Sequence, residues 1–251
     1  MAEVLLQVEG LSKRYGALVA VDSVSMHVRK GEVRAVIGPN GAGKTTLFHL
    51  ITGVVPPTSG SVRFGGSDIT RLAPHAICQR GLSRTFQLTS LFPRMSAREN
   101  AMLAAQARHP RRWTPFGGAD VFTSARAAGE EALAQLGLSH VADRPAGLLS
   151  HGDQRLLEVA MAMAQHPELL LLDEPTQGLS VEETAQAVET LAQFLDKAHI
   201  TVLLVEHDME VVFRLAHRIT VLHRGAVIAD DVPEAVKANA RVQEAYLGGI
   251  E

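Results

Sequence analysis

The sequence predicts an α/β fold with a mostly parallel sheet, antiparallel strands near the N-terminus and an inserted α-helical subdomain. Short apolar runs that end in turn residues alternate with segments of helical periodicity, and a glycine-rich loop joins one such run to a helix. The composition is that of a globular protein, with 46% hydrophobic and 20% charged residues in 251. We expect one domain over 1–251, with a core formed by 1–87 and 153–251 and a helical subdomain at about 88–152.

The predicted strands are short and rich in Val, Leu and Ile. An opening pair is expected at 3–10 and 17–28, where both segments end in turn residues. Buried strands are expected at 32–38, 169–172 and 199–208, and a strand pair with an Arg224-Gly225 turn at 217–230. Because helical segments separate most of these strands, the pattern favours parallel βαβ units.

The predicted helices have capping residues at their starts and glycines at their ends. Ser96 with Glu99, and Ser180 with Glu183, fit capping boxes. Gly53 and Gly137 follow helical segments and are expected to end them. The segment 110–118 is expected to be an exposed loop.

The bulk properties exclude several classes of protein. A net charge of −3 gives little support for binding nucleic acid or an anionic membrane, and the single Cys78 excludes an internal disulfide. The N-terminus lacks the pattern of a signal peptide, and no apolar run is long enough to span a bilayer. We therefore expect a cytosolic chain that meets a membrane only through a partner.

Residues 38–45 match the pattern G-x-x-x-x-G-K-[ST], between a predicted strand and a predicted helix. Glycines let consecutive backbone N–H groups point into one concavity, and the helix N-terminus adds positive charge. Lys44 would contact the β- and γ-phosphates, and the Thr45 hydroxyl would bind Mg²⁺. These features predict the core of a P-loop NTPase. The predicted nucleotide-binding residues are Gly38, Pro39, Asn40, Gly41, Ala42, Gly43, Lys44, Thr45 and Thr46.

Two of the predicted strands are followed by residues with acidic or imidazole side chains. Asp173 and Glu174 follow four leucines, and ligands of parallel sheets bind at that edge. We predict that Asp173 holds Mg²⁺ through its water shell and that Glu174 orients and deprotonates the attacking water. His207 would contact the γ-phosphate or hold the water. A solvated turn and a structural histidine are the alternatives. No Asn-Lys-x-Asp segment is present, so adenine is favoured over guanine.

The phosphate loop, "LSHGDQ", "LLLLDEP" and "VEHD", in this order, resemble the ATP-binding subunit of an ABC transporter. In that family two subunits dock head to tail, and the signature turn covers the γ-phosphate held by the partner subunit. The resemblance implies that Ser150 and Gly152 bind ATP in trans, at a helix N-terminus with spare N–H groups.

The resemblance also assigns other residues. Gln87 matches the family's glutamine loop and would sense Mg²⁺, Tyr15 matches the aromatic residue that stacks on adenine, and His207 matches the switch histidine. The implied catalytic residues are Glu174, His207, Lys44 and Gln87, and the implied metal-binding residues are Thr45, Gln87 and Asp173. Three positions depart from the pattern. His151 replaces a Gly, Asp153 replaces a Gln, and Ser180 stands where Asp or Asn is usual.

A finer resemblance rests on "SRTFQLTSLFPRMSARENAMLAA" and the ending "RVQEAYLGG", which are similar to the ATPases of branched-chain amino acid importers. That subfamily also includes urea, amide and aromatic-acid importers. It implies ATP and Mg²⁺ as cofactors, two integral-membrane permease subunits, and a second ATPase, homologous or identical. A periplasmic or extracellular solute-binding protein would act indirectly. The expected location is the cytoplasmic face of the inner (plasma) membrane, with no nucleic-acid partner.

Other functions stay open at this point. An ABC ATPase of DNA repair would carry long coiled coils, and one of translation usually fuses two cores; this sequence has neither. A regulatory nucleotide-binding module is disfavoured by Glu174 and His207, although Asp153 and Ser180 leave room for it. A P-loop kinase of small molecules would have no use for the signature turn.

Overall fold

The computed structural model describes residues 3–85, 91–108 and 118–247. The chain forms two compact units: Met1–Arg80 with Ile200–Glu251, and Gly81–His199. We call these the first and the second unit. The expected division at 1–87, 88–152 and 153–251 stays a prediction.

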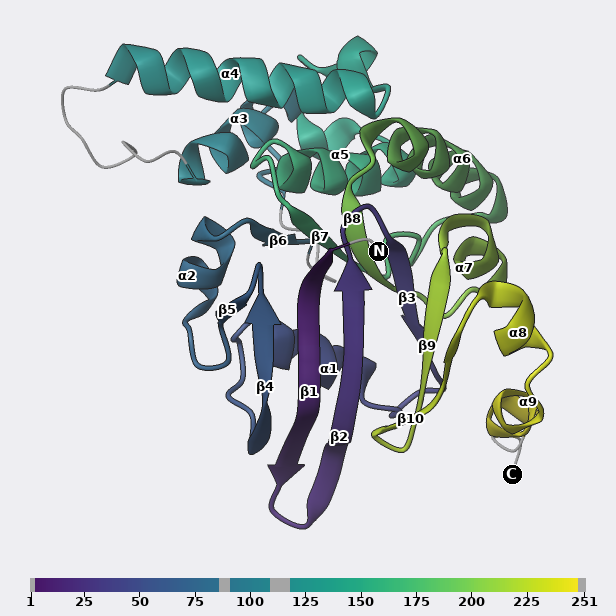
Figure 1. The fold of residues 1–251 in the computed structure, drawn as a ribbon. Coiled ribbons are helices and arrows are strands. Elements are labelled where there is room, and N and C mark those ends of the chain that lie inside the picture. Colours follow the sequence, from purple (N-terminus) through teal and green to yellow (C-terminus); the bar gives the residue numbers. More distant parts are fainter. Residues whose placement is uncertain (1–2, 86–90, 109–117, 248–251) are drawn as a thin grey trace. The chain divides into compact units, whose positions relative to one another are not determined.

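The first unit contains an antiparallel sheet in the order β2-β1-β4-β5, as expected for the N-terminal strands (Figure 1). Its strands are β1 (Val4–Tyr15), β2 (Leu18–Arg29), β4 (Ser59–Phe64) and β5 (Ser67–Asp68). The prediction that the first strand ends near Gly10 was wrong. Gly10 has φ +54° and lies where the register between β1 and β2 shifts, so the chain bulges there and continues as a strand to Tyr15.

A second group of strands in the first unit follows the order β10-β9-β3-β8. They are β3 (Val33–Ile37), β8 (Thr201–Val205), β9 (Arg218–His223) and β10 (Ala226–Asp231). β3 is parallel to both β8 and β9, whereas β9 and β10 form the predicted hairpin around Arg224 and Gly225, both with positive φ. The α/β class is therefore confirmed.

The first unit also contains helices. They are α1 (Lys44–Ile51), α2 (Pro74–Gln79), α7 (Met209–Leu215), α8 (Pro233–Lys237) and α9 (Ala240–Leu247). One buried cluster joins Ala35 and Ile37 of β3 to Val212 of α7, Val236 of α8 and Val242 of α9. The C-terminal helices therefore belong to the core that supports β3, and they lie beside β9 and β10 in Figure 1.

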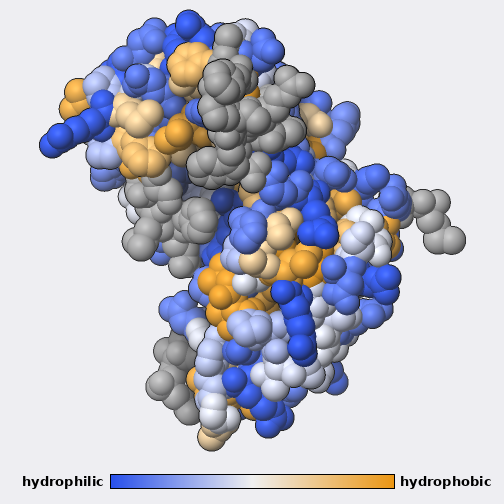
Figure 2. Space-filling model, turned by 90° about the vertical axis from the view of Figure 1, so that its left-hand side faces the viewer, coloured by the Kyte–Doolittle hydropathy of each residue, from blue (hydrophilic) through white to orange (hydrophobic). Residues whose placement is uncertain are grey.

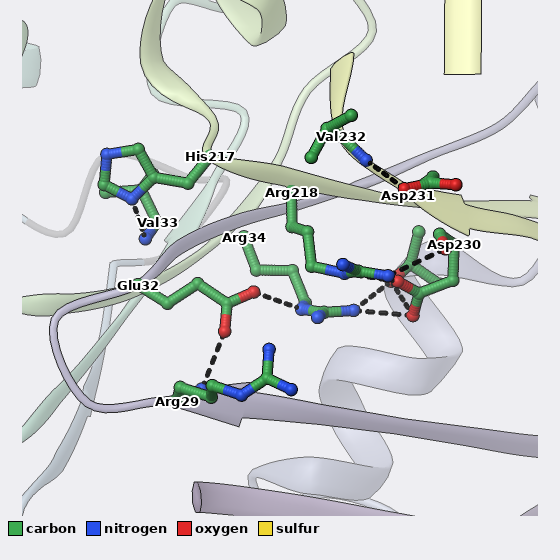
Figure 3. Close-up of polar contacts among 10 residues, drawn as sticks. Arg29, Glu32, Val33, Arg34, His217, Arg218, Asp230, Asp231 and Val232 are labelled. Carbon is green, nitrogen blue, oxygen red and sulfur yellow. Dashed lines mark hydrogen bonds and ion pairs between the residues drawn. The ribbon is translucent and has the colours of Figure 1, made fainter. Parts of the chain in front are cut away.

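A buried arginine lies within β3, at the opposite end from the glycine-rich loop. The Arg34 side chain is fully buried, its Nε donates to Glu32 Oε1 at 2.9 Å, and its Nη1 donates to Asp230 Oδ2 at 2.6 Å (Figure 3). Arg218 Nε donates to the other oxygen of Asp230 at 2.9 Å, and the Arg29 N–H donates to Glu32 Oε2 at 2.8 Å. We call these residues the Arg34 cluster; it ties β3 to β9 and β10.

The second unit pairs two parallel strands with a group of helices. Its strands are β6 (Leu82–Arg84) and β7 (Leu169–Asp173). Its helices are α3 (Ala97–Arg108), α4 (Gly118–Gln135), α5 (His151–Met163) and α6 (Val181–Ala198), with short 3₁₀ turns η1 (Leu138–Val141) and η2 (Ala146–Leu148). In Figure 1, α3, α4 and α5 pack against one another.

Both predicted capping boxes are confirmed. The Ser96 N–H donates to Glu99 Oε2 at 2.7 Å while Ser96 Oγ accepts from the Glu99 N–H at 3.1 Å. Ser180 and Glu183 form the same reciprocal pair at the start of α6, at 3.0 and 3.2 Å. Gly137 follows α4 with φ +72°, as expected for a helix end. Most of the loop expected at 110–118 lies outside the described residues.

The surface is mixed in character. Figure 2 shows hydrophobic side chains gathered in patches that hydrophilic side chains surround, on the face that it draws. No helix within the described part of the chain has the length and hydrophobicity needed to cross a bilayer.

Candidate functional site

The glycine-rich loop leaves the buried strand β3 and enters α1, as the sequence predicts. Two of its glycines are required by close packing. A Cβ on Gly38 would lie 2.2 Å from the Leu222 carbonyl oxygen, and one on Gly43 would lie 2.4 Å from the Ala20 carbonyl oxygen. Both glycines also have positive φ, so any L side chain would be strained there.

Neighbouring strands hold the loop in place from outside. The Gly225 N–H, in the β9–β10 turn, donates to the Ala42 carbonyl at 3.0 Å, and the Asp22 N–H on β2 donates to the Gly225 carbonyl at 2.8 Å. A cavity of about 720 Å³ borders the loop at residues 39–42 and is also lined by Arg224 and Arg241. Glu244 lines the same cavity, so its wall carries both positive and negative charges.

The start of α1 is arranged as an anion site. Gly43 is its N-cap, no side chain caps it, and no acidic residue lies in its first turn. Lys44 is buried, and its Nζ donates to the Gly38 carbonyl at 2.6 Å and to the Pro39 carbonyl at 3.2 Å. The ammonium group therefore lies over the loop, where an incoming phosphate could replace these carbonyl oxygens. Thr45 and Thr46 follow in the first turn.

Tyr15 ends β1 in the same unit as the loop. Its ring is 48% exposed, and Lys13 Nζ lies 5.0 Å from the ring centroid. A ring that is half open to solvent can still stack on a second flat group. Tyr15 is two residues from β2, whose Ala20 contacts Gly43 of the loop.

His207 follows β8, also in the first unit. The imidazole is 58% exposed, while the neighbouring Glu206 is fully buried and its Oε2 lies 3.7 Å from His207 Nδ1. The same carboxylate oxygen accepts from the His207 backbone N–H at 3.1 Å. Asp208 has a structural role, because its Oδ1 caps α7 by accepting from the Glu210 N–H at 2.8 Å. His207 is thus the member of this group that remains accessible.

The carboxyl end of β7 carries the two acids in the second unit. Asp173 is buried, and Arg84 Nη2 on β6 donates to its Oδ2 at 2.6 Å. Its Oδ1 is buried with no hydrogen-bond partner among the described residues. A buried carboxylate oxygen without a donor is costly unless a ligand completes it. The free oxygen of Asp173 is thus of the kind that could bind Mg²⁺, directly or through water.

Mg²⁺ usually keeps several waters and takes its other ligands from substrate phosphates. Within residues 3–85, 91–108 and 118–247, no group of three or more His, Cys, Asp or Glu side chains could hold a metal ion. Bound beside Asp173, Mg²⁺ would neutralise negative charge on the phosphates.

Glu174 has a backbone conformation that the sequence did not predict. Its φ is +50°, in the left-handed region that non-glycine residues rarely occupy. Such conformations are held only where the surrounding structure enforces them, and they occur frequently at active sites. The turn after β7 therefore fixes the direction of the Glu174 backbone.

The signature turn opens α5. Ser150 is the N-cap residue, and its Oγ accepts from the Asp153 N–H at 3.1 Å. Gly152 lies against α6, because a Cβ there would be 3.7 Å from Glu183 Cβ. The Ser180 N–H lowers the pKa of Glu183, and the Gly152 N–H and the His151 ring lower it further. Asp153 in the first turn is favourable for the helix dipole.

The predicted residues divide between the two units. The phosphate loop, Tyr15 and His207 belong to the first, and Ser150, Gly152, Asp173 and Glu174 belong to the second. Gln87 lies outside the described residues. Sequence reasoning missed Arg84, whose pairing with Asp173 joins residues far apart in the chain. The only signal in the sequence was a charged residue two positions after the apolar Leu82.

Comparisons with known proteins agree with this geometry. A family model described as "ABC transporter" matches residues 21–177, and one described as "Branched-chain amino acid ATP-binding cassette transporter" matches residues 226–251. The high-affinity branched-chain amino acid transport ATP-binding protein BraF of Pseudomonas aeruginosa is 42% identical over 256 residues, which cover 99% of each chain.

Solved structures are similar as well. The ADP conformation of an ATP-binding cassette of an ABC transporter aligns with a TM-score of 0.84 at 31% identity, covering 98% of this chain and 99% of that one. A dimeric structure of a bacterial ABC transporter cassette aligns with a TM-score of 0.76 at 25% identity, covering 91% and 99%. With its phosphate loop, its acidic strand end and its signature turn in the family's order, the chain belongs to the ABC transporter family, as an ATP-binding subunit.

Proposed function

We propose that this chain energises the uptake of branched-chain amino acids, or of a related small polar solute, as the ATPase subunit of an importer. Membership of the ABC transporter family makes it an ATP-hydrolysing transporter subunit. The solute class is supported by the printed name of the BraF relative and by the subfamily model that matches residues 226–251.

The observation that carries the nucleotide site is the uncapped start of α1 directly after the glycine-rich loop. Residues 38–46 would surround the phosphates of ATP, with Lys44 moving from the loop carbonyls to the β- and γ-phosphates. Tyr15 would stack on adenine. Thr45, Asp173 and Gln87 would bind or sense Mg²⁺, and His207 would contact the γ-phosphate. Glu174 would accept a proton from the water that attacks this phosphate.

A second copy or a homologous subunit would complete each site. At the start of α5, where Ser150 Oγ accepts from the Asp153 N–H in the isolated subunit, Ser150 and Gly152 would bind the γ-phosphate of ATP held by the partner. Two apolar side chains beside the segments that would meet the partner support this arrangement. Leu148, just before the signature turn, is 68% exposed, and Val181, just after Ser180, is 83% exposed. A partner surface that covered these two side chains would remove their apolar area from water.

The same proposal places two integral-membrane permeases next to the chain, on the cytoplasmic face of the plasma membrane. Phe122 on α4 is 54% exposed, and Phe92 is 49% exposed. Such aromatic side chains are common anchors at protein interfaces. A solute-binding protein on the other side of the membrane would act only through the permeases.

The sharpest test is E174Q in the chain assembled with its permeases. We expect steady-state turnover to fall roughly 10²- to 10⁴-fold, since the base is lost, while ATP binding persists and a dimer accumulates. E189Q, which alters an exposed glutamate on α6, is the matched control and should turn over normally. Rapid turnover by E174Q would contradict the assignment of the base.

A second variant, K44A, should lose affinity for nucleotide when binding is measured at equilibrium.

The solute is tested by reconstitution in vesicles with the permeases and the binding protein. ATP-dependent accumulation of radiolabelled leucine, and its loss in E174Q, is the expected result. ATP hydrolysis that no branched-chain amino acid, amide or urea stimulates would contradict the proposed solute class, although not the ATPase assignment.

A further inference from the structure

The ion pair between Arg84 and Asp173 has no part in the function described so far. Arg84 ends β6 and Asp173 ends β7, and the two strands are parallel with Arg84 in register with Leu171. Beyond β6, the Thr85 N–H donates to the Leu171 carbonyl at 2.9 Å, and Thr85 Oγ1 accepts from the Asp173 N–H at 3.3 Å. The backbone on both sides of the ion pair is therefore fixed.

The ion pair is buried, and only one of the two oxygens of the Asp173 carboxylate takes part in it. The side chains of Arg84 and Asp173 are 8% and 0% exposed, and Nη2 donates to Oδ2 at 2.6 Å. A guanidinium group often binds both oxygens of a carboxylate. Here Oδ1 has no partner in the described part of the chain. Arg84 thus supplies the charge that Asp173 needs inside the protein, but leaves one oxygen for another ligand.

We propose that Arg84 is a positioning residue that acts as the resident counter-ion of the metal-binding carboxylate and weakens its affinity for Mg²⁺. This inference rests on the role proposed above for Asp173. In the protein without nucleotide, the guanidinium group neutralises Asp173 and holds its Oδ2. A divalent cation at Oδ1 then meets a net charge near zero and a positive group close by, so it binds well only with nucleotide phosphates.

Electrostatics decides the direction of this effect. Removing Arg84 would free the carboxylate to rotate, which disfavours a metal by a small entropic term. It would also remove a positive charge from a buried region of low dielectric constant, where charges a few ångströms apart interact strongly. The second effect outweighs the first, so the variant should bind Mg²⁺ more tightly.

The test is a titration of full-length protein with MgCl₂ at a saturating, non-hydrolysable ATP analogue, followed by thermal melting. In R84M we expect half-maximal stabilisation at roughly three- to tenfold less Mg²⁺ than in the wild type. R84K keeps the charge and should behave as the wild type. An unchanged Mg²⁺ requirement in R84M, or a higher one, would overturn the proposal. So would an R84K variant that behaves as R84M does, because geometry would then outweigh charge.

Removing one partner of a buried pair can unfold a protein. The double variant R84M/D173N removes both charges, and it should recover most of the melting temperature that R84M loses. D173N alone separates the two proposals. If it leaves the Mg²⁺ requirement unaltered, the metal role of Asp173 fails. If it raises that requirement while R84M changes nothing, only the counter-ion role of Arg84 fails.

Discussion

The first and second units each bury an arginine among carboxylates, and the two arrangements differ in what they leave open. In the Arg34 cluster every carboxylate oxygen has a donor: Arg34 and the Arg29 N–H serve Glu32, and Arg34 and Arg218 serve Asp230 (Figure 3). In the second unit Asp173 has a donor on one oxygen and none on the other among the described residues. Pairing of a buried arginine with carboxylates thus connects strands in the first unit. In the second unit it leaves one oxygen of Asp173 without a donor among the described residues.

Backbone strain shows the same contrast within the second unit. His199 has φ +47° as the C-cap of α6, where a left-handed residue is common and ends the helix. Glu174 has φ +50° next to Asp173, the proposed metal ligand, where no helix end requires it. One strained residue is explained by local structure and the other by the proposed site.

The largest effect expected from this comparison is on stability. R34M should lower the free energy of unfolding by about 3–5 kcal/mol, because the buried Glu32 and the partly buried Asp230 lose their shared partner. Urea denaturation monitored by circular dichroism measures this change. R63M, which alters an exposed arginine on β4, should change stability by less than about 0.5 kcal/mol. If R34M cost no more than R63M, the cluster would not hold the strands together.

A smaller effect is expected from Asp230, and it depends on pH. Burial tends to raise the pKa of Asp230, but Arg34 and Arg218 outweigh burial and hold this pKa below 3.8. Asp230 therefore stabilises the fold fully above the unfolded value near 3.8, and this contribution disappears as the pH falls through the lower folded value.

At pH 7, D230N should thus cost about 1.5–3 kcal/mol, the range for hydrogen bonds to charged groups. Denaturation at a series of pH values would show the gap between wild type and D230N closing in acid. D196N on the exposed face of α6 is the control, and it should show no such gap at neutral pH. A gap that widened in acid would contradict the predicted direction.

The smallest effect concerns the two strained residues. E174G and H199G should each raise the free energy of unfolding by roughly 0.5 kcal/mol, because glycine adopts positive φ without strain. The two variants should differ in ATPase activity: H199G should hydrolyse ATP as the wild type does, whereas E174G should not. Differential scanning calorimetry with an ATPase assay measures both. Loss of turnover in H199G would show that strain at a helix end is also functional.

Local patterns in the sequence predicted much of this structure. The phosphate loop between strand and helix, both capping boxes and the turn at Arg224 and Gly225 depend on residues a few positions apart, and all were confirmed. The strand expected to end at Gly10 was extended by a bulge, which depends on pairing with β2 and so lies beyond local signals.

The unpredicted features all depend on contacts between distant parts of the chain. Arg34 and Asp230 are 196 positions apart, and Arg84 and Asp173 are 89 apart. The sequence marks each as a charged residue at a strand, but the choice of partner follows only from strand order. The φ of Glu174 depends likewise on how β7 ends, and nothing in its own chemistry favours a left-handed backbone.

The bond from Gly225 to Ala42 has a consequence for the order in which the protein is made. Residues near position 40 leave the ribosome early, yet the Leu222 carbonyl and the Gly225 N–H that pack against their loop are synthesised close to the end of the chain. A growing polypeptide therefore lacks the outer support of its phosphate loop until translation is almost complete.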